Sequence, residues 1–187
     1  DEAYISFLKN GWQQWSILDG SSEEIIPNVH PGRNMNANPS AIVSAAGYYQ
    51  ADTACPIGAK TWEGAKASAD TVIAAASNLL DRHQNNEHEN FVYSLCRPPG
   101  HHAYADQAGG FCFLNNCAIA ANFFLKKGCT RIAILDVDVH HGNGTQGIFY
   151  ERSDVLTVSL HGDPSEYYPF FAGYEEEVGL ANGKNFN

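Results

Sequence analysis

The chain has 187 residues, of which 44% are hydrophobic and 12% aromatic, proportions typical of one globular domain that can bury a core. Eleven Lys and Arg residues against 21 Asp and Glu residues give a formal net charge of −10, which argues against a nucleic-acid partner and suits a neutral or cationic ligand. The 5 cysteines include no CxxC pair, and no apolar run approaches the roughly 18 residues that span a bilayer, so we expect a reduced, cytoplasmic protein without a membrane partner.

The first part of the chain is predicted to be helical around one long loop. Residues 1–18 carry aromatic and apolar side chains at helical spacing, interrupted by Gly11, which predicts one or two short amphipathic helices. Residues 19–39 are rich in Gly, Ser, Asn and Pro and predict a loop of a length that is often functional or interfacial. The Ala-rich residues 61–80 then predict a scaffold helix.

The second part of the chain alternates predicted strands with predicted helices. Apolar runs predict strands at 91–95, 131–139 and 155–160, and helical patterns predict helices at 115–128 and 144–150. Because no hairpin signal joins the strands, we expect an α/β fold of three α/β/α layers, with a mainly parallel sheet that helices cover on both faces.

Polar side chains follow each predicted strand at its carboxyl end, where open α/β sheets bind their ligands. Side chains alternate between the two faces of a strand, so Asp136, Asp138 and His140 share one face of the strand 131–139. Asp138 and His140 are ligand types for a zinc-like divalent ion and can approach it from one side. The alternative for this pair alone is that both residues cap a loop.

A histidine pair, His101 and His102, follows RPPG after the predicted strand 91–95. Two neighbouring imidazoles repel each other when both are charged, so the pair suggests one neutral and one protonated ring. Each ring then needs a partner at its far nitrogen, and the candidates are Asp136 and Asn143. A surface loop is the alternative for such a pair standing alone.

Glycines and aromatic residues occur together in GGFCF, which contains Phe111, and in YYPFF, which contains Tyr167 and Tyr168. Aromatic rings beside glycines, which allow the backbone to approach closely, can wall a narrow tunnel for a slender aliphatic chain. Taken one at a time, each ring is also a candidate for the hydrophobic core.

Four segments make the sequence resemble a known family. RPPGHHA, GFCFLNN, AILDVDVHHGNGTQGIFY and VSLHGDP are similar to the arginase-fold deacetylases, which include histone deacetylases and bacterial acetylpolyamine amidohydrolases. The resemblance runs through most of residues 1–175, and DEAYISFLKNGWQQW, the HPGRNM loop and GYYQADTACPI most resemble the acetylpolyamine amidohydrolase branch. GHHA followed by GFCFLNN points away from the related arginases, which use two manganese ions.

The resemblance implies a zinc-dependent amidohydrolase that removes acetyl groups from acetylated polyamines, which are small cationic substrates. Asp138 and His140 match two of the family's three zinc ligands, and Fe²⁺ is the alternative metal. The family also holds a structural K⁺ or Na⁺ ion near the zinc and a second such ion farther away. The matching positions are Asp136, Asp138, His140, Ser159 and Leu160 for the first ion, and Phe149, Arg152 and Val155 for the second.

The resemblance also implies roles in catalysis and substrate binding. His101, with Asp136 behind it, matches the first of two tandem catalytic histidines. His102, with Asn143 behind it, matches the second and is the better candidate for the general base and then acid. The positions that match the substrate tunnel and the acetate cavity are Gly110, Phe111, Cys112 and Tyr168.

The family's third zinc ligand, an Asp, and the Tyr that stabilises its oxyanion have no match in the sequence, and neither has the family's first strand. We therefore expect 1–187 to be the central portion of a single deacetylase-like catalytic domain that is incomplete at both ends and binds zinc weakly alone. The alternatives are a protein acetyl-lysine deacetylase and a catalytically inactive fragment or binding module. The resemblance further implies a homo-oligomer formed through the 19–39 loop.

Overall fold

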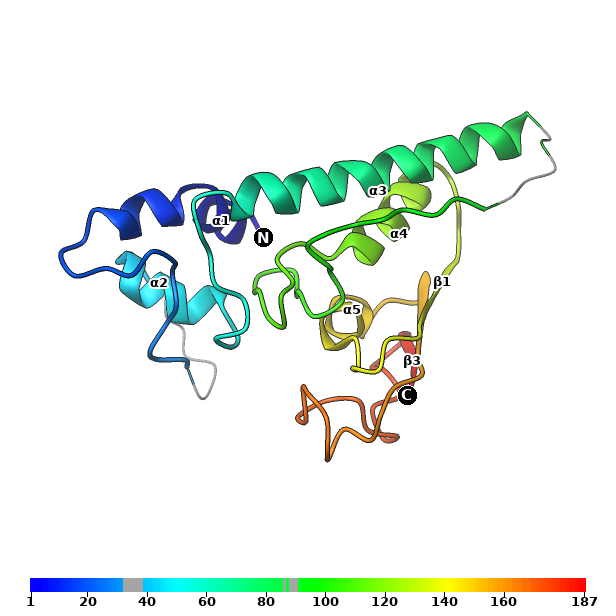
Figure 1. The fold of residues 1–187 in the computed structure, drawn as a ribbon. Coiled ribbons are helices and arrows are strands. Elements are labelled where there is room, and N and C mark those ends of the chain that lie inside the picture. Colours follow the sequence, from blue (N-terminus) through cyan, green and yellow to red (C-terminus); the bar gives the residue numbers. More distant parts are fainter. Residues whose placement is uncertain (32–38, 86, 88–90) are drawn as a thin grey trace.

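The structure, a computed structural model, describes residues 1–31, 39–85, 87 and 91–187, so part of the 19–39 loop lies outside the described residues. It has the α/β architecture with a parallel sheet that the sequence predicts (Figure 1). The elements in chain order are α1 (Glu2–Ser16), α2 (Ile42–Tyr49), α3 (Thr61–Gln84), α4 (Asn116–Lys126), β1 (Ile132–Asp136), α5 (Asn143–Phe149), β2 (Val155–Ser159) and β3 (Lys184–Phe186).

α1 is one uninterrupted helix that passes through Gly11. Its start is capped by Asp1, whose side-chain oxygen accepts a 2.9 Å hydrogen bond from the backbone N–H of Tyr4. A Cβ atom at Gly11 would lie 3.1 Å from the Phe7 ring and 3.4 Å from the side chain of Ile25. The glycine therefore marks a place of close packing, and that packing offsets the low helix propensity of glycine.

The larger hydrophobic core lies where α1, α2 and the start of α3 meet, at one end of the molecule in Figure 1. Tyr4 is 1% exposed, and its hydroxyl donates a 2.7 Å hydrogen bond to the carbonyl of Phe113, which ties α1 to the segment before α4. α2 was not predicted from the sequence, although its alanines favour a helix. This core supports the segment that follows α2.

α3 crosses the molecule as a helix of 24 residues and packs against α4 (Figure 1). It continues past the predicted end at residue 80 because DRHQ contains no Gly or Pro, and because Arg82 and His83 suit the last turn of a helix. In the described part of the chain, no helix is both long and apolar enough to cross a membrane.

The sheet has three strands in the order β1-β2-β3, all parallel. Ile132 of β1 lies opposite Val155 of β2, and the register continues to Asp136 opposite Ser159. The helices predicted at 115–128 and 144–150 are confirmed as α4 and α5. β3 was not predicted, because three residues in a Gly- and Asn-rich segment show no alternation that stands out.

α4 and α5 cover one face of the sheet. Ile132 and Ile134 of β1 pack there beside Phe149 of α5 in a second, smaller core. Among the described residues, the opposite face is open, and Leu135 on that face is 62% exposed. The face that α4 and α5 cover is also the face on which Asp136 lies, so the smaller core sits directly below the polar strand ends.

β1 is shorter than the predicted strand 131–139. A carboxylate oxygen of Asp136 accepts a hydrogen bond from the N–H of Asp138 at 3.1 Å, and an Asp138 oxygen accepts one from the N–H of His140 at 2.8 Å. Side chains that capture nearby backbone donors compete with the ladder of a sheet. The strand therefore ends at Asp136, and the next residues turn toward the site.

The prediction of a buried strand at 91–95 is wrong. These residues form no strand with any described part of the chain, and the Phe91 and Tyr93 side chains are 75% and 82% exposed. An apolar run gains a strand conformation only from pairing with a neighbour, and no described segment, 91–95 included, pairs with the free edge of β1 in the order β1-β2-β3. The segment still delivers RPPGHH to the site.

Candidate active site

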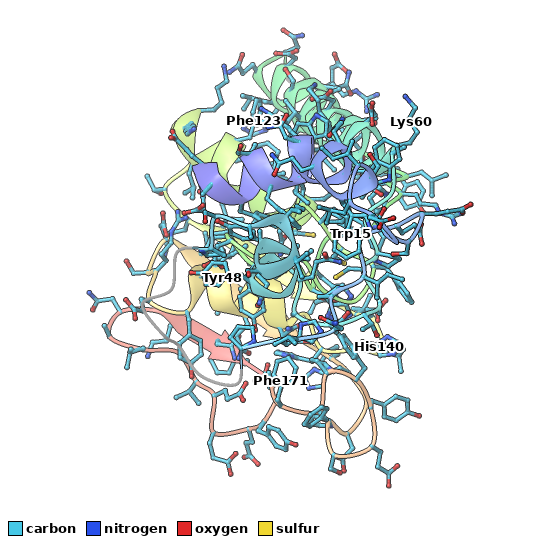
Figure 2. The ribbon with its side chains drawn as sticks, turned by 90° about the vertical axis from the view of Figure 1, so that its left-hand side faces the viewer. Trp15, Tyr48, Lys60, Phe123, His140 and Phe171 are labelled. Atoms are coloured by element: carbon cyan, nitrogen blue, oxygen red, sulfur yellow. The ribbon has the colours of Figure 1, made fainter. Side chains whose placement is uncertain are left out.

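The candidate site lies at the carboxyl end of β1 and β2, where loops from three parts of the chain meet. His101 and His102 come from the loop before α4, Asp138 and His140 from the turn after β1, and Tyr168 from the loop after β2. The Tyr168 ring lies 4.7 Å from the His102 ring and 6.2 Å from the His140 ring. Figure 2 shows His140 in the lower part of the molecule, which also holds the loop that follows β2.

His101 is paired with Asp136, as the sequence predicts. Its Nδ1 atom lies 2.8 Å from Oδ2 of Asp136. Gly142 makes room for this carboxylate, since a Cβ atom there would lie 2.3 Å from the same oxygen. Burial acts to raise the pKa of Asp136, but the hydrogen bond and charge of His101 and the N–H of Asp138 outweigh it and lower the pKa. Asp136 is therefore ionised at neutral pH.

His102 is paired with Asn143, at the first residue of α5. Its Nδ1 atom lies 2.7 Å from Oδ1 of Asn143, and the residue is 4% exposed. α5 can approach this closely because Gly144 has no side chain: a Cβ atom there would lie 2.3 Å from the carbonyl oxygen of Ala103. An amide oxygen only accepts hydrogen bonds, so Nδ1 carries the proton of the neutral ring and Nε2 keeps a free lone pair.

The two histidines differ in electrostatic environment. Their ring centres are 3.9 Å apart, with 41° between the planes. Burial, and then the charge of His101, lower the pKa of His102 to about 4, while the hydrogen bond to Asn143 acts in the opposite direction. His102 is therefore neutral at pH 7 and able to accept a proton at Nε2.

Asp138 and His140 lie together at the open side of the site, with side chains 49% and 41% exposed. Oδ1 of Asp138 is 3.1 Å from Nδ1 of His140. Ligand atoms about 2.0–2.2 Å from a tetrahedral zinc ion are about 3.3–3.6 Å from one another, so this carboxylate and imidazole would need to separate by only a few tenths of an ångström to occupy two corners of a zinc site. Within the described ranges, no three His, Cys, Asp or Glu side chains gather in a group that could hold a metal.

The predicted tunnel residues Gly110, Phe111 and Cys112 form a tight turn beside His102. Gly109 and Cys112 exchange backbone hydrogen bonds of 3.1 and 2.8 Å, and Gly110 and Phe111 have φ angles of +49° and +68°. A Cβ atom at Gly110 would lie 2.4 Å from the His102 ring and 2.9 Å from the Tyr168 ring. The backbone of Gly110 thus fills the space between these two rings, where no other residue fits.

Phe111 and Cys112 point in different directions from this turn. Phe111 is 67% exposed and lies beside a cavity of about 960 Å³, which Pro98, Pro99 and Phe113 also line. Cys112 is fully buried, and burial raises the pKa of its thiol to about 12, so the thiol stays neutral.

The positions matched to the first monovalent cation meet between β1 and β2. Asp136 and Ser159 line a cavity of about 10 Å³, close to the volume that one water molecule needs. The backbone carbonyl of Asp136 accepts a 2.9 Å hydrogen bond from the N–H of Leu160, and Oγ of Ser159 lies 2.8 Å from Nδ1 of His161. Asp138 and His140 follow directly on the exposed side.

The positions matched to the second cation also lie close together. The N–H of Arg152 donates a 2.9 Å hydrogen bond to the carbonyl of Phe149, and the Arg152 guanidinium lies 4.9 Å from the centre of the Phe149 ring. Val155, 1% exposed, belongs to the same small core as Phe149.

Sequence reasoning missed several polar residues around the site. His141, 2% exposed, lies 2.9 Å through Nε2 from Oε1 of Gln146, and Nε2 of Gln146 donates to Glu177 at 2.6 Å. Asn185 of β3 donates to the same Gln146 oxygen at 2.8 Å. Asp52 contacts the Gly110 turn from the other side. Glu177, Asn185 and Asp52 lie far in sequence from the motif that holds His141 and Gln146, so no spacing in the sequence connects them to it.

Comparison with known proteins places this geometry in a family. All of residues 1–187 match the histone deacetylase domain family. Acetylpolyamine amidohydrolase 2 of Pseudomonas aeruginosa is 48% identical over 189 residues, which cover all of this chain and 53% of that protein. Acetylpolyamine amidohydrolase of Mycoplana ramosa is 45% identical over 183 residues, which cover 98% of this chain and 52% of that protein.

A solved structure agrees with this assignment. The crystal structure of the acetylpolyamine aminohydrolase from Burkholderia pseudomallei matches this fold with a TM-score of 0.89 and 41% sequence identity, over all of this chain and 53% of that chain. The chain thus spans about half the length of these relatives. The match along its whole length shows that the chain belongs to the histone deacetylase family.

Proposed function

We propose that the protein hydrolyses the acetyl amide of acetylated polyamines with a bound zinc ion. One observation carries the chemistry: a buried, neutral His102 with a free Nε2 lies beside His101 and faces the Asp138–His140 pair. The substrate class is supported by the names of the relatives from P. aeruginosa and M. ramosa and by the net charge of −10, which favours a polycation.

Asp138 and His140 would hold the metal, which is Zn²⁺ or, with the same donors, Fe²⁺. When bound, such an ion polarises an amide carbonyl and lowers the pKa of water. A K⁺ or Na⁺ ion near Asp136 and Ser159 would stabilise the carboxyl ends of β1 and β2. The second cation would stabilise the chain near Phe149.

The histidines move the proton. His102 accepts a proton from the attacking water at Nε2, because its Nδ1–H is engaged by Asn143. Asp136 stabilises positive charge on His101. The protonated imidazole then gives the proton to the amine nitrogen as the amide C–N bond breaks. The oxygen of the water stays on the acetyl carbon, and the products are acetate and the free amine.

The walls of the site would hold the substrate chain. Phe111 and Tyr168 would flank its methylene groups, and the carbonyl of Gly110 would accept a hydrogen bond from the substrate amide. Cys112, a neutral thiol below the turn, would border the acetyl group.

The test compares two substrates on the complete, zinc-loaded protein. We expect kcat/KM for an acetylated spermidine-type amine to exceed that for an acetyl-lysine peptide. A clear preference for the peptide would replace this proposal with protein lysine deacetylation. Zinc analysis separates both from a binding module, because a well-folded protein that binds no zinc would have no such chemistry.

We also propose that the protein is a cytoplasmic homo-oligomer that pairs through the 19–39 loop. In the described part of that loop, Val29 is 71% exposed, while Ile25 is anchored by backbone hydrogen bonds to Ile57. A loop anchored at one point with an exposed apolar residue beside it suits a contact between subunits. A Val29→Asp variant that keeps the same elution volume as the unchanged protein in size-exclusion chromatography would contradict this pairing.

A further inference from the structure

Asp52 lies in the segment that follows α2, within the motif GYYQADTACPI, and its carboxylate joins three parts of the chain. Oδ1 accepts a 2.8 Å hydrogen bond from the N–H of Ala54. Oδ2 accepts two more, from the N–H of Gly110 at 3.1 Å and from the hydroxyl of Tyr168 at 2.6 Å. Gly110 is 58 residues away in sequence and Tyr168 is 116 residues away, so one oxygen connects both sides of the substrate site.

The Gly110 side of this contact is a turn that needs support. Gly110 and Phe111 both have positive φ angles, and a non-glycine residue such as Phe111 pays a conformational cost there. The segment around Asp52 supplies further hydrogen bonds: the N–H of Phe111 donates to the carbonyl of Ala54 at 3.2 Å, and the N–H of Ala51 donates to the carbonyl of Ala108 at 2.7 Å. The turn is thus held from one side by residues 51–54.

The Tyr168 side of the contact belongs to the long loop after β2. The Tyr168 ring stands edge-on to the His102 ring, at 87°. Burial and the hydrogen bond to Asp52 both raise the pKa of Tyr168, so its hydroxyl stays protonated and donates. A phenylalanine at this position would fill the same space but would have no hydroxyl to donate to Asp52. The neighbouring Phe170 and Phe171 are 68% and 53% exposed, so the loop gains little from burial there.

We propose that Asp52 is a positioning residue that ties the Gly110 turn to Tyr168 and so fixes the two walls of the substrate site relative to each other. This inference rests on the proposed function for its effect on turnover, because those walls align the acetylated amine. Asp52 acts through neutral hydrogen-bond donors, since none of the ion pairs found in the described residues includes it. The hydrogen bonds of the Asp52 carboxylate go to Ala54, Gly110 and Tyr168, and not to Asp138 or His140.

The test uses Asp52→Asn, Tyr168→Phe and the double variant in the complete, zinc-loaded protein, with the exposed Asp106→Asn as control. In Asp52→Asn an NH2 group, which cannot accept, replaces the oxygen that bonds Gly110 and Tyr168 while the remaining oxygen accepts from Ala54, and Tyr168→Phe removes the hydroxyl donor. We therefore expect each change to lower kcat/KM about 10-fold and the double variant to lose no more than the larger single loss. Zinc content stays unchanged. Losses that multiply in the double variant, or an unchanged Asp52→Asn protein, would overturn the proposal.

Two further readouts separate positioning from other roles. Hydrogen exchange at the Gly110 amide should speed up in Asp52→Asn but not in Tyr168→Phe, and this result does not depend on any activity, so it stands even if the proposed function fails. Turnover of an acetylated amine with a neutral tail should fall as much as that of an acetylated polyamine. A loss confined to the cationic substrate would show that Asp52 acts by charge and would overturn the positioning role.

Discussion

The two halves of the candidate site are built differently. The histidine half is buried and complete within this chain: His102 is 4% exposed, and both imidazoles have a partner at Nδ1. The metal half is open: Asp138 and His140 are 49% and 41% exposed and contact mainly each other. The histidine half is supported by α4, α5 and the glycines that allow the backbone to approach closely, whereas the metal half is a turn after β1.

The two halves therefore depend on different interactions. The properties of the histidines are set by burial and neighbouring groups, so they exist without a metal. Those of Asp138 and His140 depend on the ion they would share, since their other contacts are with solvent and backbone. Substitutions in one half should therefore leave the other largely intact.

The largest effect is expected in the metal half. Asp138→Asn replaces a charged ligand by a neutral amide, so we expect zinc to be lost and deacetylation to fall by more than about 10⁴-fold in the complete protein. Zinc content and acetate release measure both. Asp163→Asn is the control, because it changes a carboxylate of the loop after β2 whose hydrogen bonds, among the described residues, go only to Ser165. Retention of zinc together with activity in Asp138→Asn would exclude this residue as a ligand.

The next largest effect is expected at the buried histidine. His102→Gln removes the proton acceptor but keeps a polar side chain, so kcat should fall about 10²–10⁴-fold. Zinc content should not change, in contrast to Asp138→Asn. The exposed His83→Gln in the last turn of α3 is the matched control. If His102→Gln loses zinc and activity together, the two halves are not separable.

A smaller effect is expected behind His101. Asp136→Asn keeps an oxygen that can accept from Nδ1 of His101 but removes the negative charge, so we expect kcat to fall about 10–100-fold. The pH dependence of kcat should shift as well, because the substitution removes the ionised carboxylate of Asp136 from beside the histidine pair. A variant with unchanged kcat and unchanged pH profile would show that Asp136 does not support His101 in turnover.

The smallest effect concerns stability rather than turnover. The pKa of His102 falls from 6.5 to about 4 on folding, so the unfolded chain takes up a proton before the folded one does. The free energy of unfolding should therefore decrease as the pH falls from about 7 to about 4, by up to about 3 kcal/mol from this group, and level off below. Urea unfolding across this range measures it.

His102→Gln should flatten that dependence, while His83→Gln should leave it unchanged. His141 contributes in the same direction, because burial also lowers its pKa, so some slope should remain in His102→Gln. An identical slope in His102→Gln and the unchanged protein would show that His102 is not held neutral by burial.

The sequence predicted the parts of this site that rest on local pattern. The shared strand face predicted for Asp136, Asp138 and His140 is not present, because β1 ends at Asp136, but the predicted contacts of Asp136 and Asn143 with the two histidines are. Such predictions succeed because spacing within a strand or loop limits where a side chain can point.

Other features depend on contacts between distant segments and could not be read from spacing. The apolar run 91–95 has the composition of a strand, but strand formation needs a partner that the pattern does not reveal. Gly11 is typical of a helix break, but α1 continues through it because the helix packs closely there, against Phe7. Asp52 was part of a recognised motif, yet its contact with Tyr168 spans 116 residues.

The proposed metal site is tested by a zinc titration of the complete protein after treatment with a chelator, with acetate release from an acetylated polyamine as the readout. If Asp138 and His140 hold a catalytic ion beside a preformed histidine pair, activity should be absent at the start, rise in proportion to added zinc and level off at one equivalent per chain. Full activity in the metal-free protein, or none at any zinc concentration, would contradict it.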